Sequence, residues 1–196
     1  MSLVLYPNPM LKEKSKLIVN SIPDDKNLQK LINKMVTIMD TFNGVGLSAI
    51  QIGVPLNLFV LRVNGVRQVV INPSIITVSK EFSYENEGCL SAPAVYTRIR
   101  RPEGLSVKFM DETGTMQERT YTGLMARAFQ HEYDHLCGVT FFDRMNTIQR
   151  AAALKKYKKI TDKIPKEYFE QATDNIMNEK DMSVTPEVPT SPATTS

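Results

Sequence analysis

Apolar residues recur at steps of three and four between Leu28 and Phe42, which is the period of a helix with one buried face. Asp24 or Asp25 precedes this stretch and can accept hydrogen bonds from the free backbone N–H groups of its first turn. Asn43-Gly44 follows it and is a suitable end. The pattern therefore predicts a helix whose buried positions are Leu28, Leu31, Ile32, Met35, Ile38, Met39 and Phe42.

Two further helices are predicted in the C-terminal part of the chain. One is a buried helix that runs from about Leu124 to Cys137 and stops at Gly138. The other runs from Thr147 to Ile164 and carries lysines on the side opposite its apolar residues. The apolar side of this last helix is expected to consist of Ile148, Ala152, Leu154, Tyr157, Ile160 and Ile164.

The middle of the chain has the pattern of β-strands. The segments 56–63 and 66–71 flank Asn64-Gly65, which supplies the positive φ angles of a type I′ turn, so they are predicted to form a hairpin. Helices and strands come in blocks and not in regular alternation, which favours an α+β fold. Further strands are expected at 75–78, 95–99, 105–110 and 116–121, with a turn at Glu112-Thr113-Gly114.

Three glycines frame a run of small residues between Gly44 and Gly53. No regular amphipathic template fits this stretch. We interpret it as a loop in which glycine lets other groups approach the backbone closely.

Length and composition describe one domain. The 196 residues suffice for one domain with a core, which we place at 1–165 and which includes the last helix. An extension at 166–196 is rich in Ser, Thr and Pro and is predicted to be unfolded beyond about residue 178. A net charge of +3 does not by itself argue for nucleic acid. Without a membrane-length apolar run or a signal peptide, a cytoplasmic protein with no membrane partner is expected.

The chain has only two histidines, His131 and His135, and Glu132 lies between them on the second predicted helix. Residues four apart share one face of a helix, so both imidazoles can point to a common ion. This HExxH pattern offers two nitrogen ligands and a glutamate that can take a proton from water at the metal. The alternative is two ordinary core or surface histidines in a pattern that arose by chance.

A catalytic metal needs a third protein ligand, and no histidine remains to supply it. Cys89 is one candidate, because metal binding or catalysis is the better use for at least one of the two cysteines. Its alternative is a buried structural cysteine. Glu170 is the other candidate ligand, as in metallopeptidases that combine HExxH with a later glutamate. The residues alone leave this choice open.

Three segments stand out along the chain: Gly44-Val45-Gly46-Leu47-Ser48-Ala49-Ile50-Gln51, Glu87-Gly88-Cys89-Leu90-Ser91 and Gln130-His131-Glu132-Tyr133-Asp134-His135. Together they resemble the three motifs of the peptide deformylases, in the family's order and with similar separations. The resemblance extends from the N-terminus to about residue 160 and does not cover the tail. Ser48 stands where alanine is frequent in the family, and Tyr133 occupies a variable position.

The resemblance implies a metal-dependent amidase. Its expected reaction is hydrolysis of the N-formyl group from the terminal formyl-methionine of new polypeptides, with release of formate. Glu132 would be the catalytic acid and base. One divalent ion, Fe2+ or Zn2+, is expected, since a thiolate ligand suits both. Its implied ligands are Cys89, His131 and His135.

The resemblance also implies roles for residues around the metal. The side-chain amide of Gln51 and the backbone N–H of Leu90 match positions that stabilise the oxyanion of the reaction. Glu87 and Arg101 match an ion pair that supports the ligands. Asp134 is expected to anchor the metal-binding helix, with a plain surface aspartate as the alternative.

A substrate pocket for methionine follows from the same resemblance. Val45, Leu124 and Ala128 are expected to line it, although ordinary core packing is an equal alternative for Leu124. Gly46 is expected to leave room for the peptide backbone of the substrate. Cys137 matches no functional position and is interpreted as a small buried hydrophobic residue.

We expect antiparallel β-sheets packed around a central metal-binding helix, with an N-terminal helix and a C-terminal helix. The basic C-terminal helix resembles the one by which bacterial members approach the ribosome, and a merely solvated amphipathic helix is the alternative. Expected partners are formyl-methionyl nascent peptides and the ribosome, without direct sequence-specific binding of nucleic acid. Two rival functions are an HExxH zinc metallopeptidase with Glu170 as third ligand and a noncatalytic module stabilised by metal.

Overall fold

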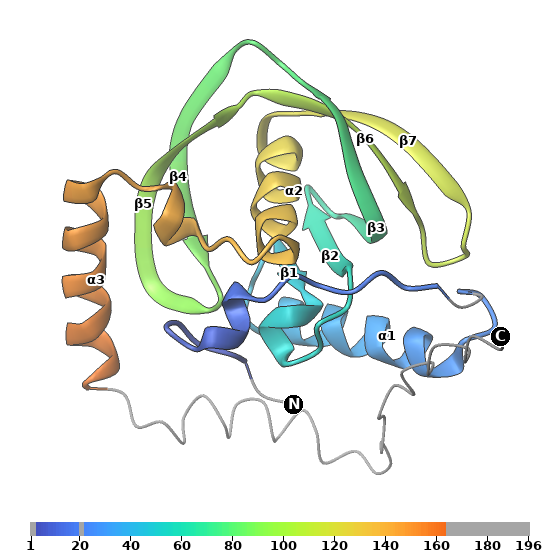
Figure 1. Cartoon of the computed structure of the whole chain (residues 1–196), viewed down its shortest axis with the longest axis horizontal. Helices are drawn as coiled ribbons and strands as arrows, with labels where there is room; N and C mark the ends of the chain where they lie inside the picture. Colours follow the sequence, from blue (N-terminus) through green and yellow to red (C-terminus); the bar gives the residue numbers. More distant parts are fainter. Residues whose placement is uncertain (1–2, 20–21, 164–196) are drawn as a thin grey trace, which may run out of the picture.

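The computed structural model describes residues 3–19 and 22–163, and in these residues seven strands form two antiparallel sheets around a central helix (Figure 1). One sheet has five strands in the order β1-β2-β3-β6-β7, and the other pairs β4 with β5. The strands are β1 (Gly46–Ser48), β2 (Leu58–Val63), β3 (Val66–Val78), β4 (Phe82–Cys89), β5 (Ala92–Pro102), β6 (Gly104–Met110) and β7 (Met116–Thr122).

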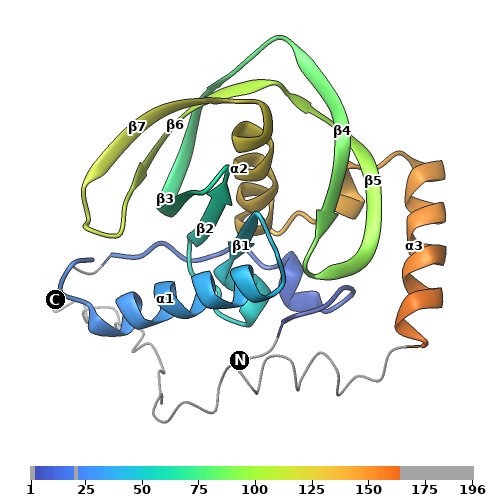
Figure 2. The ribbon, with the colours of Figure 1, turned by 180° about the vertical axis from the view of Figure 1, so that it is seen from behind.

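Three α-helices accompany the sheets: α1 (Lys26–Thr41), α2 (Gly123–Leu136) and α3 (Thr147–Thr161). Helix α2 lies between the two sheets, α1 lies below the five-stranded sheet, and α3 lies beside β5, as the two opposite views show (Figures 1 and 2). The predicted α+β fold is therefore confirmed. The described residues also contain short 3-10 helices: η1 (Pro9–Lys12), η2 (Ala49–Ile52) and η3 (Phe141–Arg144).

Helix α1 forms as its apolar pattern predicts. The carboxylate of Asp25 accepts hydrogen bonds from the backbone N–H groups of Asn27 and Leu28, both at 3.0 Å, and so caps the first turn. After Thr41 the chain leaves the helix, and Asn43 adopts a positive φ of 52°. The buried face comprises Leu28, Leu31, Ile32, Met35, Ile38 and Met39.

Strand β2 is buried on both faces, because α1 packs against one side of the five-stranded sheet and α2 against the other. Leu58 and Val60 belong to the core that includes α1. Phe59, Leu61 and Val63 belong to the core that includes α2. Because successive side chains of a strand point to opposite faces, this alternation fixes α2 against one side of the sheet and α1 against the other.

The predicted hairpin is confirmed, with Asn64 and Gly65 at φ values of 51° and 78° between β2 and β3. Segment 75–78 is not a separate strand, because β3 continues to Val78 through two shifts in its pairing with β6. Such bulges bend a strand without ending it. Strand β4 was not predicted, because its exposed polar residues obscure the alternation.

The interpretation of residues 44–53 as a loop is wrong. Gly46–Ser48 forms β1 at the edge of the five-stranded sheet, where Gly46 pairs with Leu61 and Ser48 with Phe59. The next four residues form η2. A strand of three residues is too short to show a period in the sequence, and it is recognisable only through its pairing with β2.

Helix α3 packs against the β4–β5 sheet with a face that agrees only in part with the predicted one: Tyr157 is buried and Leu154 is partly buried, as predicted. Ala153 and Tyr157 are buried, whereas Ala152 is exposed and Ile148 is 83% exposed. Cys137 is exposed as well, so its predicted burial is wrong. Within the described residues, no helix combines the length and apolar character needed to cross a membrane. Ile164, Glu170 and the extension 166–196 lie outside the described residues.

Candidate metal centre

Helix α2 carries three functional candidates into the interior. His131, Glu132 and His135 are all buried, and the two imidazole rings lie 5.2 Å apart between centroids. The helix ends at Leu136, and Gly138 follows with a positive φ of 72°. The predicted placement of both histidines on one helix face is therefore present.

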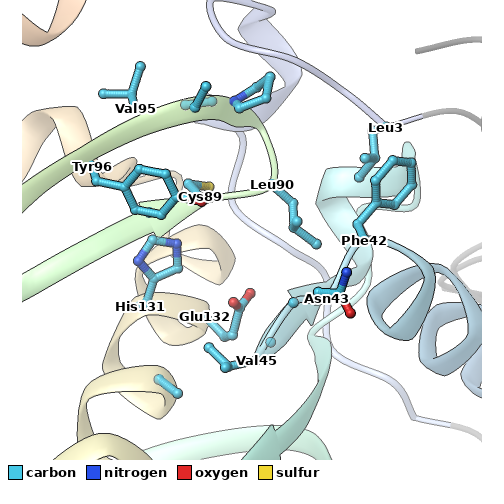
Figure 3. Close-up of a pocket in the computed structure, with 17 residues that line it drawn as sticks. Leu3, Phe42, Asn43, Val45, Cys89, Leu90, Val95, Tyr96, His131 and Glu132 are labelled. Atoms are coloured by element: carbon cyan, nitrogen blue, oxygen red, sulfur yellow. The ribbon is translucent and has the colours of Figure 1, made fainter. Parts of the chain in front are cut away.

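Cys89 reaches the same place from the other sheet. It is the last residue of β4, just after an irregularity in the β4–β5 pairing between Gly88 and Cys89. Its Sγ lies 3.2 Å from Nε2 of His135. One ligand atom from each of Cys89, His131 and His135 lies within 4.8 Å of the others. Figure 3 shows the sulfur on the strand above His131 and Glu132.

This donor set fits a metal ion. One sulfur and two ring nitrogens converge from a strand and a helix, and such a set suits a tetrahedral divalent ion with one position free for water. The ring atom of His135 that faces Cys89 is Nε2. Its other ring nitrogen, Nδ1, is buried and has no hydrogen-bond partner among the described residues. The three residues could therefore hold one ion.

Glu87 supports His131 from behind, and the expected ion pair with Arg101 is present. Oε1 of Glu87 accepts a hydrogen bond from Nε of Arg101 at 2.6 Å, and Oε2 lies 3.1 Å from Nδ1 of His131. Burial alone would raise the pKa of Glu87, but the hydrogen bonds with His131 and Arg101 outweigh it and lower the pKa to about 2. The carboxylate is thus ionised and orients the imidazole.

Two arginines in this network were missed by the sequence reasoning. Arg127 donates to Glu87 at 2.5 Å, and Arg144 donates through Nε to Asp134 at 2.9 Å. Asp134 also accepts from Arg101 at 2.8 Å, so it anchors α2 and is not a plain surface aspartate. Arg127 could have been found, because it lies four residues before His131 on the buried face of a helix. Arg144 lies in η3, and no spacing rule connects it with α2.

Glu132 lies between α2 and β1 in a closely packed position. Ser48 Oγ donates a hydrogen bond to Oε2 of Glu132 at 2.6 Å. Burial raises the pKa of Glu132, and the charge of His131 and the bond from Ser48 oppose this only in part. A Cβ on Gly46 would lie 2.5 Å from Oε1 of Glu132, so the missing side chain makes room for this carboxylate. The side of Gly46 on which a Cβ would lie is occupied by Glu132, and its predicted role of leaving room for substrate stays a prediction.

Gln51 is buried with its amide in a defined orientation. Its Oε1 accepts the backbone N–H of Ser48 at 2.8 Å, which leaves Nε2 to face the metal ligands. Nε2 lies 3.4 Å from Sγ of Cys89 and donates to Oγ of Ser91 at 3.1 Å. Ser91 was not singled out from the sequence, although it belongs to the Cys89 motif.

The two histidines have opposite electrostatic surroundings. Burial lowers the pKa of His135 well below its usual value, and the charge of His131 lowers it further. Burial also disfavours the charged form of His131, but Cys89 and Glu87 outweigh it and raise the pKa of His131 well above its usual value. Cys89 and Glu87 thus favour the protonated form of His131, whereas burial and the positive charges of His131 and Arg101 disfavour protonation of His135.

A pocket of about 350 Å³ opens beside these residues and is lined by apolar side chains next to His131 and Glu132 (Figure 3). Val45, Gly46 and Ala128 line it as predicted. Leu124 does not line it and is 50% exposed, so core packing is also wrong for this residue. Other lining residues include Leu3, Phe42, Leu90, Val95 and Tyr96.

Comparison with known proteins identifies this arrangement. The family model described as polypeptide deformylase matches residues 1–151. A peptide deformylase of Borreliella burgdorferi is 44% identical over 80% of this chain and 94% of its own length, and one of Mesorhizobium japonicum is 39% identical over 83% and 94%. A crystal structure of a peptide deformylase from Legionella pneumophila superposes with a TM-score of 0.75 at 35% identity over 83% of this chain and 98% of that one.

A plant structure agrees. Peptide deformylase 1B of Arabidopsis thaliana superposes with a TM-score of 0.75 at 36% identity, over 87% of this chain and 93% of the plant chain. The matched region contains all the described residues that converge on the candidate metal centre. The chain therefore belongs to the peptide deformylase family.

Proposed function

We propose that this peptide deformylase releases formate from N-terminal formyl-methionine with the help of one divalent ion held by Cys89, His131 and His135. The main support is the convergence of their ligand atoms within 4.8 Å, beside a buried glutamate and an apolar pocket. A bound ion would polarise the formyl carbonyl and lower the pKa of water at the site.

Glu132 is proposed to move the proton during hydrolysis. It takes a proton from the attacking water as the new carbon–oxygen bond forms, and gives it to the amine nitrogen as the carbon–nitrogen bond breaks. The products are formate and a peptide with a free amino terminus. A raised pKa suits this double role, because a carboxyl group with a pKa nearer neutrality both accepts and returns a proton readily.

Gln51 and Leu90 are proposed to stabilise the oxyanion that forms at the formyl oxygen when water attacks the formyl carbon. The Gln51 amide is held with Nε2 toward Cys89, so an N–H donor faces the reaction centre. Leu90 follows Cys89 in the chain and lines the pocket, which supports its backbone N–H as the second donor. These donors act on charge that develops only during the reaction.

The methionine side chain is proposed to enter the pocket beside Glu132. Val45 and Ala128 contribute apolar surface there, and Gly46 brings backbone into the wall. A flexible unbranched thioether fits an apolar cavity of about 350 Å³. Recognition then depends on burial of the first side chain.

A direct assay tests the proposal. Protein purified without oxygen and loaded with Fe2+ or Zn2+ should release formate from a formyl-methionyl peptide and should leave the acetyl-methionyl peptide unchanged. Glu132→Gln should keep its metal and lose kcat by about 10²–10⁴-fold. Retained activity in Glu132→Gln would show that Glu132 is not the catalytic acid and base, and would contradict the proposal. Activity that air destroys and that iron restores, but zinc does not, would identify Fe2+.

The metallopeptidase alternative is not favoured, because the family match and the position of Cys89 both point to the deformylase reaction. Glu170, the ligand that the alternative needs, lies outside the matched residues 1–151. A peptide with a blocked but not formylated N-terminus should therefore remain uncut. Internal cleavage of such a peptide would revive the alternative.

Helix α3 is proposed to contact the ribosome. Ala153 and Tyr157 hold the helix against the protein, and its exposed surface carries Lys155, Lys156, Lys158 and Lys159. This row of cations fits a polyanionic surface. Replacing the four lysines with glutamine should reduce cosedimentation with ribosomes, whereas the same change at Lys30 and Lys34 of α1 should not. Because its substrates are nascent chains, we propose that the enzyme acts in the cytoplasm.

A further inference from the structure

The hydroxyl oxygen of Ser48 contacts two different atoms of Glu132. This Oγ lies 2.6 Å from Oε2 of the side chain and 3.0 Å from the backbone carbonyl oxygen of the same residue. A hydroxyl that reaches both ends of one glutamate is compatible with only a narrow set of side-chain rotamers. The contact therefore restricts where the carboxylate can lie.

The opposite side of the carboxylate is restricted by the backbone. A Cβ at Gly46 would lie 2.5 Å from Oε1 and 2.8 Å from Cγ of Glu132, so the glycine backbone packs directly against the side chain. Gly46 and Ser48 are the first and last residues of β1. The carboxylate is thus held by two residues of one short strand.

The serine itself is held rigidly. It is fully buried, and β1 pairs with β2 so that Ser48 lies opposite Phe59, a core residue. A donor on a paired strand keeps its position better than one on a loop. Glu132, by contrast, has a flexible side chain whose direction must be set by its surroundings.

The backbone of Ser48 has a separate role. Its N–H donates to Oε1 of Gln51 at 2.8 Å and so fixes which end of that amide faces Cys89. Every residue except proline keeps this N–H. Replacing the Ser48 side chain therefore keeps the contact of this backbone N–H with the Gln51 side chain and removes the contact of the hydroxyl with Glu132.

We propose that the hydroxyl of Ser48 is a positioning group that holds Glu132 in the orientation needed for proton transfer. This inference rests on the proposed role of Glu132. Ser48 touches neither the substrate nor the metal ligands in this role, so its loss should reduce the rate of the chemical step and leave binding of the metal and substrate unchanged. A loss of orientation, and not of the acid and base itself, is expected to cost about tenfold in kcat.

The test compares Ser48→Thr with Ser48→Val, which have the same shape and differ only in the hydroxyl. Any strain from the added methyl group is common to both. We expect kcat of the threonine variant to exceed that of the valine variant by about tenfold, with KM within twofold and one metal per chain in each. Ser48→Ala should resemble the valine variant in kcat.

Several outcomes overturn the inference. Equal kcat values for Ser48→Thr and Ser48→Val would show that the hydroxyl does not act on Glu132. A loss of metal or a matching rise in KM in Ser48→Val would show a structural role. Ser15→Ala is the control for removing a hydroxyl. Ser15 Oγ is buried without a hydrogen-bond partner among the described residues, so kcat of this variant should equal that of wild type.

Glu132→Gln, measured in the same assay, separates this inference from the proposed function. Full activity in Glu132→Gln would reject the role of Glu132 and, with it, the role of Ser48. If Glu132→Gln is inactive and Ser48→Thr and Ser48→Val have equal kcat values, only the proposed role of Ser48 is rejected.

Discussion

Oε2 of Glu87 lies 3.1 Å from Nδ1 of His131, and this contact connects a buried ion-pair network to the candidate metal ligands. An ionised carboxylate only accepts hydrogen bonds, so the proton of the imidazole must be on Nδ1. In the neutral ring that a metal requires, Nε2 is then the nitrogen that carries a free lone pair. The network thereby selects the tautomer of His131 that can bind a cation.

Replacing Glu87 should weaken metal binding. In Glu87→Gln the carboxylate that orients His131 is lost, and the affinity for Zn2+ should fall by about 10- to 100-fold, measured by competition with a chelator. Glu85→Gln is the matched control, because Glu85 lies on the same strand and is exposed. Equal affinities in the two variants would contradict the supporting role of Glu87.

The same carboxylate should make stability depend on pH. Its pKa of about 2 in the folded protein lies below the ordinary value of 4.5, so its contribution is complete above about pH 4.5 and is lost as pH falls toward 2. The contribution is about 3 kcal/mol, at roughly 1.4 kcal/mol per pKa unit. Urea unfolding of metal-free protein should show a steeper acid loss for wild type than for Glu87→Gln, whereas parallel curves would disprove this.

A side chain at position 46 should disturb Glu132. The Cβ of Gly46→Ala would lie 2.5 Å from Oε1, so the carboxylate must move and kcat should fall by about 100-fold or more. Gly65→Ala provides the contrast, because Gly65 has a positive φ of 78° in the β2–β3 turn. That variant should lose about 1 kcal/mol of stability in urea unfolding and keep its kcat. Normal kcat in Gly46→Ala would show that Glu132 tolerates displacement.

Removing the amide of Gln51 should slow the reaction. In Gln51→Ala an oxyanion donor is lost, and kcat should fall by about 10²–10³-fold with KM nearly unchanged. Gln29→Ala is the control, since Gln29 donates only to backbone carbonyl oxygens of Ile22 and Glu112 away from the site. If the two variants behave alike in steady-state assays, Gln51 is not such a donor.

The features that depend on residues close together in the sequence were predictable. The cap at Asp25, the Asn64-Gly65 turn and the histidine pair on α2 each depend on a spacing of a few residues, and the structure contains all three. Helix geometry relates His131 to His135 without knowledge of the rest of the fold. The same reasoning left both Cys89 and Glu170 as candidates for the third ligand until the motifs were compared.

The features that the sequence could not predict depend on contacts between elements that meet only in the folded chain. Strand β1 exists only because β2 lies beside it, and the buried face of α3 depends on where the β4–β5 sheet lies. The contact of Ser48 with Glu132 joins residues 84 positions apart. Arg144, the last residue of η3, likewise meets Asp134 of α2 without a spacing rule that connects the two. No local pattern contains these relationships.

The central claim is that Cys89, together with the two histidines, holds the ion. The most direct test is to count the metal bound to purified wild type, Cys89→Ala and Glu170→Ala under identical anaerobic conditions. We predict about one ion per chain in wild type and Glu170→Ala and almost none in Cys89→Ala, with formate release following the metal content. A full complement of metal in Cys89→Ala, or an empty site in Glu170→Ala, would contradict the account.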